Sequence, residues 1–166
     1  MERIPISVEG YSRMKAELER LKKERPDVIE AIRLAREEGD LSENAGYEAA
    51  KERQGMLEAK ISYIESRMPA YNVVDLASLE GDKIIYGATV RLADLESGEE
   101  RRYTLLGPDE TDFAPRDSGA VSVYSPVGRA LLGKEEGDEV VVNAPRGRIH
   151  YEIKEISFLG PVIPAL

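Results

Sequence analysis

Residues 37–51 read EEGDLSENAGYEAAK, and they lie between two long segments whose apolar residues recur every three or four positions. This period of about 3.5 residues is what two packed helices need along their contact. The acidic residues near 37–44 therefore occupy the connection between two helical arms. The stretch predicts an antiparallel helical hairpin with an acidic tip, whose carboxylates are available to a second molecule.

The apolar seam of the hairpin can be followed along both arms. In the first arm it consists of Tyr11, Met14, Leu18, Leu21, Val28, Ile32 and Ala35. In the second it consists of Tyr47, Ala50, Leu57, Ile61, Ile64 and Met68. Arg25 and Gln54 interrupt the seam, and a turn near Ser42 would place them in one polar layer. We expect Ser7 to cap the first helix and Pro26 to kink it. The alternative, amphipathic helices lying on a globular core, normally requires a wider apolar stripe.

The remainder of the chain has a different pattern. Short β-rich runs, separated by turn residues, cover 83–95, 101–106, 120–124, 139–144 and 149–158. One helix is expected among them, with Ser125 as its cap, Pro126 at its first position and Gly133 after its end. The fold class is therefore α+β. We expect a hairpin over residues 1–76, a compact β-rich domain with one short helix over 77–158, and an irregular tail over 159–166.

Composition excludes several kinds of function. The net charge is −9, so independent binding to duplex DNA is not expected, because neutralising phosphates requires a basic face. The absence of cysteine excludes disulfides and zinc sites with cysteine ligands. We find no charged leader before an apolar run and no apolar stretch of membrane-spanning length. These features predict a cytoplasmic protein that does not associate with a membrane.

Asp40 and Glu43 are the candidate functional acids of the tip. They are three residues apart, so a turn can direct both carboxylates at one point. The alternative is a capping box, with Asp40 as N-cap of the second helix and Glu43 at its third position. Hard carboxylate oxygens also suit Mg²⁺, which commonly takes one or two protein carboxylates. Two acids alone would hold Mg²⁺ weakly, so a partner would have to supply the other ligands.

Basic residues lie close to the acidic tip on both helical arms. Arg36 and Lys51 flank the turn, and Arg33 and Arg53 lie close to them in the sequence. One interpretation is a solvated face with helical ion pairs, which contribute little. The other is a basic patch, Arg36 with Lys51, that guides the end of a single-stranded RNA toward the acids.

Over roughly residues 3–158 the sequence resembles a known family, the bacterial Gre transcript cleavage factors. The most specific match is the stretch 39–45, GDLSENA, which continues through Tyr47 and residues 49–52. Residues 121–126, VSVYSP, with 129–134, RALLGK, form a second match, and residues 86–90 form a third. Gly46 departs from the family, which usually has a larger residue there, and the tail after Leu159 is longer than expected.

The resemblance implies a coiled-coil hairpin followed by a domain of FKBP-like fold. That domain would dock on RNA polymerase at its secondary channel, and the hairpin would enter the channel. The polar turn before the short helix adds the hypothesis that Ser125 and Pro126 lie near the contact. Asp40 and Glu43 would help to hold an Mg²⁺ ion that the polymerase active site supplies; the free protein would bind no cofactor tightly. The polymerase would then cleave the 3′ end of the nascent, backtracked RNA. The chain would thus be a cofactor protein, not an enzyme by itself.

Three other functions remain open from the sequence. An inhibitory relative would plug the same channel without promoting cleavage, although the tip keeps the pattern of cleavage factors. A prolyl isomerase would use the FKBP-like domain, but the chain has no Trp and only Phe113 and Phe158 to line an aromatic pocket. A non-catalytic adaptor would use the hairpin as a protein-binding rod.

Overall fold

The computed structural model describes residues 2–38 and 44–166. The chain forms two compact units. The hairpin unit is Met14–Ala70, and the sheet unit combines Met1–Arg13 with Tyr71–Leu166. The first residues of the chain thus belong with its C-terminal part, whereas the sequence suggested one N-terminal domain over 1–76.

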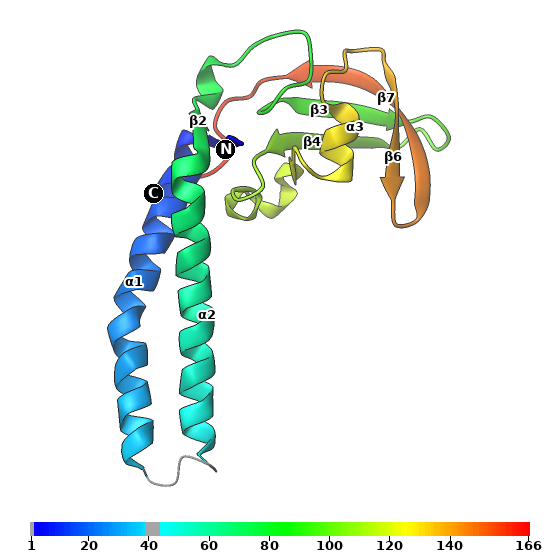
Figure 1. The fold of residues 1–166 in the computed structure, drawn as a ribbon. Coiled ribbons are helices and arrows are strands. Elements are labelled where there is room, and N and C mark those ends of the chain that lie inside the picture. The colour runs from blue at the N-terminus through cyan, green and yellow to red at the C-terminus, as the bar shows by residue number, and fades with distance from the viewer. Residues whose placement is uncertain (1, 39–43) are drawn as a thin grey trace. The chain divides into compact units, whose positions relative to one another are not determined.

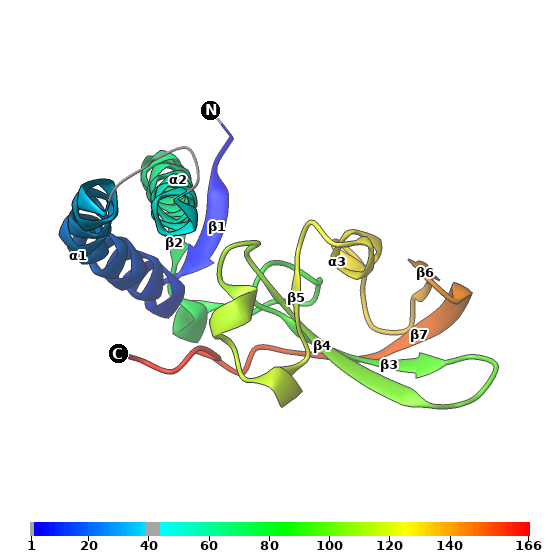
Figure 2. The ribbon, with the colours of Figure 1, turned by 90° about the horizontal axis from the view of Figure 1, so that it is seen from below.

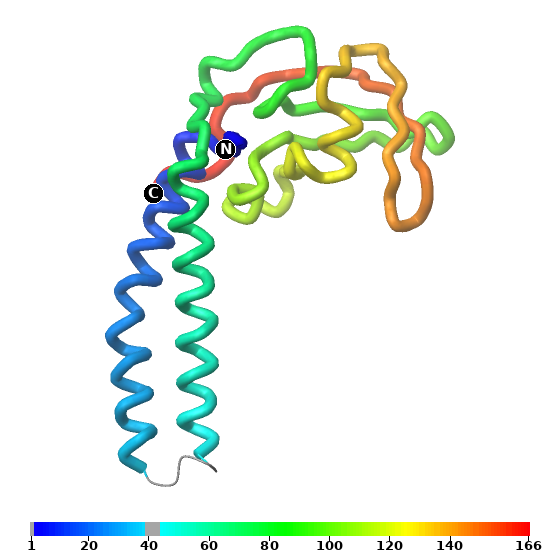
Figure 3. The backbone as a smooth tube through the Cα atoms, viewed as in Figure 1, coloured from blue at the N-terminus to red at the C-terminus, as the bar shows by residue number. Residues whose placement is uncertain are grey.

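Two long helices make the hairpin, α1 (Val8–Glu37) and α2 (Ala45–Arg67). They lie side by side and antiparallel (Figures 1 and 3). The residues buried along them belong to the predicted seam: Met14, Leu21, Val28, Ile32 and Ala35 of α1, and Leu57, Ile61 and Ile64 of α2. The predicted hairpin is therefore confirmed. α1 continues as one helix through Pro26.

The polar layer of the hairpin differs from the expectation. Arg25 contacts Glu58 rather than Gln54, with Nε 2.7 Å from Oε1 and Nη2 2.9 Å from Oε2. Gln54 instead accepts a hydrogen bond from Lys51 at 3.4 Å. A carboxylate matches the two-pronged guanidinium better than an amide does, and Glu58 is one helical turn beyond Gln54. The Arg25 and Glu58 side chains are 40% and 44% exposed, so this pair contributes little to stability.

The sheet unit is built on a curled five-stranded sheet in the order β5-β4-β3-β7-β6. Its strands are β3 (Thr89–Asp94), β4 (Glu100–Leu106), β5 (Ala120–Ser122), β6 (Glu139–Ala144) and β7 (Gly147–Ser157). All neighbouring strands are antiparallel except β4 and β5. The short helix α3 (Pro126–Leu131) packs on the sheet through Leu131, which is fully buried with Val90, Leu92 and Ile153. The predicted fold class is therefore confirmed.

The strand predictions were correct in place but not in every boundary. β6 has the predicted bounds, whereas the run predicted from residue 83 becomes a strand only at Thr89. Gly87 interrupts it with φ of +89°, in a turn packed against Leu76 and Leu79. Lys83 forms only an isolated bridge with Glu135.

The sheet unit also contains a separate pair of parallel strands that was not predicted. β1 (Ile4–Ser7) pairs with β2 (Tyr71–Val74), and the two lie side by side in Figure 2. Three short 3₁₀ turns, Leu76–Ser78, Thr111–Phe113 and Arg116–Ser118, follow in the same unit. A fourth, Met68–Ala70, closes the hairpin unit. Short pairings between distant segments leave no periodic pattern in a sequence, so they could not be predicted.

The start of α1 is fixed by a buried carboxylate from far along the chain. Ser7 is the N-cap, as predicted: its Oγ accepts from the Gly10 N–H at 3.0 Å. Oε1 of Glu110 accepts from both the N–H and the Oγ of Ser7, at 2.9 and 2.6 Å. Oε2 of Glu110 accepts from the Gly107 N–H at 2.8 Å and from the Tyr86 hydroxyl. Glu110 therefore does what the third helical residue does in a capping box, because Gly10 at that position has no side chain.

The C-terminal tail is part of the sheet unit. Ile163 is 3% exposed and packs with the buried Leu76 and Leu106. The Nε and Nη2 of Arg13 both donate to the carbonyl of Pro164, at 3.1 and 2.7 Å. Residues 159–166 contain no helix or strand, yet these contacts give them a fixed place.

Candidate functional site at the end of the helical hairpin

The acids predicted at the tip, Asp40 and Glu43, lie outside the described residues. The structure describes the two helix ends on either side of them. α1 ends at Glu37 and α2 begins at Ala45. Chain connectivity alone therefore confines both acids to the short connection between these helix ends.

Asn44 is the N-cap of α2. Its Oδ1 accepts from the Tyr47 N–H at 2.9 Å, and its Nδ2 donates to the carbonyl of Ala35 on α1 at 2.6 Å. The alternative in which Asp40 caps this helix is therefore wrong. That alternative named Asp40 because Glu43 completes a capping box with it, although Asn44 is an equally good cap type. Asn44 is the residue of this site that the sequence analysis missed.

The predicted basic pair, Arg36 and Lys51, lines one open hollow beside the helix ends. The hollow has a volume of about 560 Å³. It is lined by Ile29, Ile32, Arg33, Arg36, Glu37, Lys51 and Gln54. The guanidinium carbon of Arg36 lies 5.8 Å from the ring centre of Tyr47, a cation–π contact between the two helices. The structure thus brings the pair together and gives Arg36 a structural contact as well.

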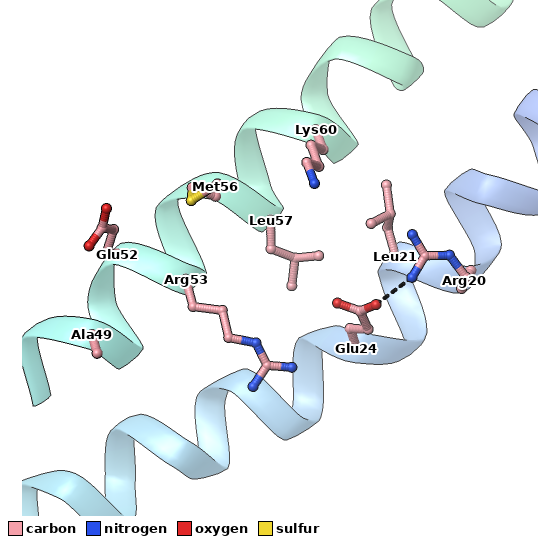
Figure 4. A pocket seen from close by; sticks show the side chains of 9 residues that line it. All are labelled: Arg20, Leu21, Glu24, Ala49, Glu52, Arg53, Met56, Leu57 and Lys60. Carbon is pink, nitrogen blue, oxygen red and sulfur yellow. Dashed lines mark hydrogen bonds and ion pairs between the residues drawn. The ribbon is translucent and has the colours of Figure 1, made fainter. Parts of the chain in front are cut away.

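The other two basic residues considered from the sequence are placed differently. Arg33 donates to Glu30 and Glu37, with distances of 2.6 Å to each, so its charge is balanced locally. Arg53 lines a second hollow of about 380 Å³, where its guanidinium reaches from α2 toward α1 (Figure 4). Arg20 in the same hollow is paired with Glu24 at 2.6 Å. Arg53 is therefore not part of the Arg36–Lys51 patch.

The predicted docking residues, Ser125 and Pro126, begin α3. The Ser125 Oγ accepts from the Gly128 N–H at 3.1 Å and donates to the carbonyl of Ser122 at 2.6 Å. Pro126 occupies the first helical turn and is exposed. Gly133 follows the helix with φ of +83°. The predicted helix is confirmed, and the cap role of Ser125 accounts for its side-chain contacts.

Within residues 2–38 and 44–166, no three His, Cys, Asp or Glu side chains gather as metal ligands would. The donors predicted for Mg²⁺ are Asp40 and Glu43, and carboxylate oxygens are the donors that this ion prefers. In the part of the chain that the structure describes, no helix has the length and apolar character needed to cross a bilayer.

Both parts of this chain match sequence families of known proteins. Residues 4–73 match the family described as "Transcription elongation factor, N-terminal", and residues 79–158 match "Transcription elongation factor, GreA/GreB, C-term". A transcription elongation factor GreA of Nitratidesulfovibrio vulgaris is 69% identical over 160 residues, which is 96% of either chain. The chain belongs to the GreA/GreB family of transcription elongation factors. Another GreA, from Solidesulfovibrio magneticus, is 64% identical over 165 residues and 99% of either chain.

Solved structures of the GreA/GreB type resemble the chain less closely. The GreA factor homolog 1 protein of Thermus thermophilus is 26% identical, covers 94% of this chain and 99% of its own, and has a TM-score of 0.44. With that score below 0.5, membership in the GreA/GreB family is based on the sequence matches. The resemblance that the sequence suggested is confirmed by those matches.

Proposed function

We propose that this GreA/GreB-family factor binds RNA polymerase and stimulates the polymerase's own cleavage of the 3′ end of backtracked RNA. Arrested complexes would then resume elongation. One observation supports the proposal most. The helix α1 ends at Glu37 and the antiparallel helix α2 begins at Ala45, so the chain segment that carries Asp40 and Glu43 connects these two helix ends.

The carboxylates of Asp40 and Glu43 would hold Mg²⁺ jointly with ligands from the polymerase. The bound ion would lower the pKa of a water molecule and offset charge on the transferred phosphate. Two carboxylates are too few to hold Mg²⁺ tightly in the free protein, because this ion keeps several waters unless other ligands replace them. The chain would thus lend ligands to a reaction whose remaining groups belong to its partner.

The basic pair and the sheet unit would have separate roles. Arg36 and Lys51 line one hollow beside the helix ends, which supports a role in guiding the phosphates of the RNA 3′ end. The exposed Pro126, at the start of α3, supports a polymerase contact near Ser125 and Pro126. Because Ser125 also caps α3, a loss of binding in a Ser125 variant has to be separated from a loss of folding.

The test uses a stalled, backtracked elongation complex whose RNA is labelled at its 3′ end. Wild-type protein should release short labelled fragments. Asp40→Ala and Glu43→Ala should each lower the stimulated cleavage rate by at least about 10- to 100-fold. That range is typical for loss of a residue that only supports a metal ligand, and a ligand itself should matter at least as much. Both variants should still compete with wild type for the polymerase.

Glu52→Ala is a matched control, since Glu52 is an exposed acid of α2 away from the connection. It should cleave like wild type. Wild-type rates in the Asp40 and Glu43 variants would contradict the proposed ligand role. Tight binding without any fragment release by wild type would instead identify an inhibitor of the secondary channel.

A further inference from the structure

We propose that Asn44 is a positioning residue for the cleavage reaction, because its side chain ties the end of α1 to the start of α2 and so restrains the acidic connection between them. This inference rests on the proposed function. Asn44 would touch neither RNA nor metal. It would act through Asp40 and Glu43, whose chain segment begins and ends at the two helix ends that Asn44 joins.

The two hydrogen bonds of Asn44 connect one backbone group of each helix. The first N–H groups of a helix have no partner within it, and the Ala35 carbonyl also accepts from the Glu38 N–H at 3.3 Å. Asn44 Oδ1 accepts from the N–H of Tyr47, in the first turn of α2, at 2.9 Å. Asn44 Nδ2 donates to the C=O of Ala35, in the last turn of α1, at 2.6 Å. The partners are a backbone donor and a backbone acceptor, so they fix which way the amide points.

Few side chains can form this double contact. A carboxylate at position 44 would accept from Tyr47 but has no hydrogen to donate to Ala35. A serine hydroxyl would cap the helix as well as Asn, but it is shorter than the amide. The neighbouring residue also suits the contact: a Cβ on Gly46 would lie 3.3 Å from the Asn44 Oδ1. Glycine at position 46 therefore leaves room for the Asn44 amide.

A second contact between the helices lies beside the first. The guanidinium of Arg36 lies over the ring of Tyr47. The N–H of Tyr47 is also the group that donates a hydrogen bond to Asn44. Ala35 is buried, whereas Asn44 and Tyr47 are half-buried. The nine-residue separation from Ala35 to Asn44 is thus closed by a hydrogen bond that is partly shielded from water.

The consequence for the acids follows from polymer physics. Joining the ends of a short segment removes many of its conformations before a partner binds. Ligands that are already restricted lose less freedom when they meet the metal, and the reaction gains from that orientation. Loss of the Ala35 bond should therefore weaken the action of Asp40 and Glu43 without changing the docking surface on the sheet unit.

The decisive variant is Asn44→Ser, which keeps the cap of α2 and removes the bond to Ala35. We expect unchanged helix content by circular dichroism and unchanged competition for polymerase. The maximal cleavage rate at saturating factor should fall by about tenfold, and the Mg²⁺ concentration for half-maximal cleavage should rise. Raising Mg²⁺ should recover part of the rate. Asn44→Ala, which loses both bonds, should be impaired further and should show less helix.

Each outcome decides the question. If Asn44→Ser cleaves like wild type at every Mg²⁺ concentration, the Ala35 bond does not position the acids. If only Asn44→Ala is impaired, capping is the whole role of Asn44, and the proposal is again overturned. A wild-type protein that stimulates no cleavage would overturn the proposed function together with it, so the two failures are distinguished.

Discussion

Replacing Gly10 with alanine should destabilise the protein, although the same change elsewhere in a helix stabilises it. Gly10 lies in the first turn of α1, where alanine is ordinarily favoured over glycine by about 1 kcal/mol. A Cβ on Gly10, however, would lie 2.4 Å from Oε1 of Glu110 and 2.9 Å from its Cβ. It would also lie 3.0 Å from a side-chain carbon of Ile6. The buried carboxylate of Glu110 would have to move.

The size of the effect follows from the bonds that this movement breaks. Oε1 accepts two hydrogen bonds from Ser7, at 2.9 and 2.6 Å. Glu110 and Ser7 are both at most 1% exposed, so water cannot replace a lost partner. Each broken bond then costs about 1–3 kcal/mol. After the gain in helix propensity is subtracted, Gly10→Ala should lower the free energy of unfolding by roughly 1–5 kcal/mol.

Gly55→Ala is the matched control, because Gly55 lies inside α2 with nothing within 4 Å of its added Cβ. It should raise the free energy of unfolding by about 1 kcal/mol. Urea unfolding followed by circular dichroism measures both variants. In a Glu110→Ala background the Oε1 atom is gone, whereas the Cβ at 2.9 Å remains, so Gly10→Ala should destabilise less than it does in the wild-type background. Stabilisation by Gly10→Ala in the wild-type background, or equal costs in both backgrounds, would contradict a clash between the added Cβ and the Glu110 carboxylate.

The remaining predictions concern pH, the tail and the basic pair. Burial, and then the neighbouring Glu110, raise the pKa of Tyr86 above its usual value. The stability linked to the neutral form of Tyr86 is therefore complete below about pH 10. Above that pH the free energy of unfolding should fall by about 1.4 kcal/mol per pH unit. Urea unfolding of Tyr86→Phe should show a shallower alkaline loss. Ile163→Ala should cost about 2–5 kcal/mol, against roughly 0.5 or less for Leu159→Ala at a 62% exposed position, by thermal unfolding. Arg36→Gln with Lys51→Gln should flatten the salt dependence of cleavage by up to about 0.7 per lost phosphate contact, and an unchanged slope would mean that the pair only solvates the hairpin.

Local patterns in the sequence were sufficient to predict the hairpin, the places of the main strands along the chain, and α3. The seam residues of α1 and α2 repeat at a helical period, and that period is written in the chain whatever the rest of the fold does. Ser7, Ser125 and Gly133 likewise act through groups only a few residues away. Local signals of this kind predicted the caps of α1 and α3 and the end of α3 correctly.

The sequence was insufficient to predict a contact where two residues suit the same role, or where the partner is distant in the chain. Asp40 and Asn44 are both good cap types, and the choice of Asn44 depends on the Ala35 carbonyl of the opposite helix. Arg25 could face Gln54 or Glu58, one turn apart, and the relative shift of the two helices decided for Glu58.

The contacts that the two ends of the chain make depend on the tertiary fold. Glu110 completes the cap of Ser7 across 103 residues, and Arg13 holds Pro164 across 151 residues. Such pairings follow from the folding of the whole sheet unit, and no local pattern encodes them. The sequence therefore specified which elements form, because periodicity and capping act over a few residues. The tertiary structure specified what Gly10, Asn44 and the tail do, because each depends on a group that only folding brings near.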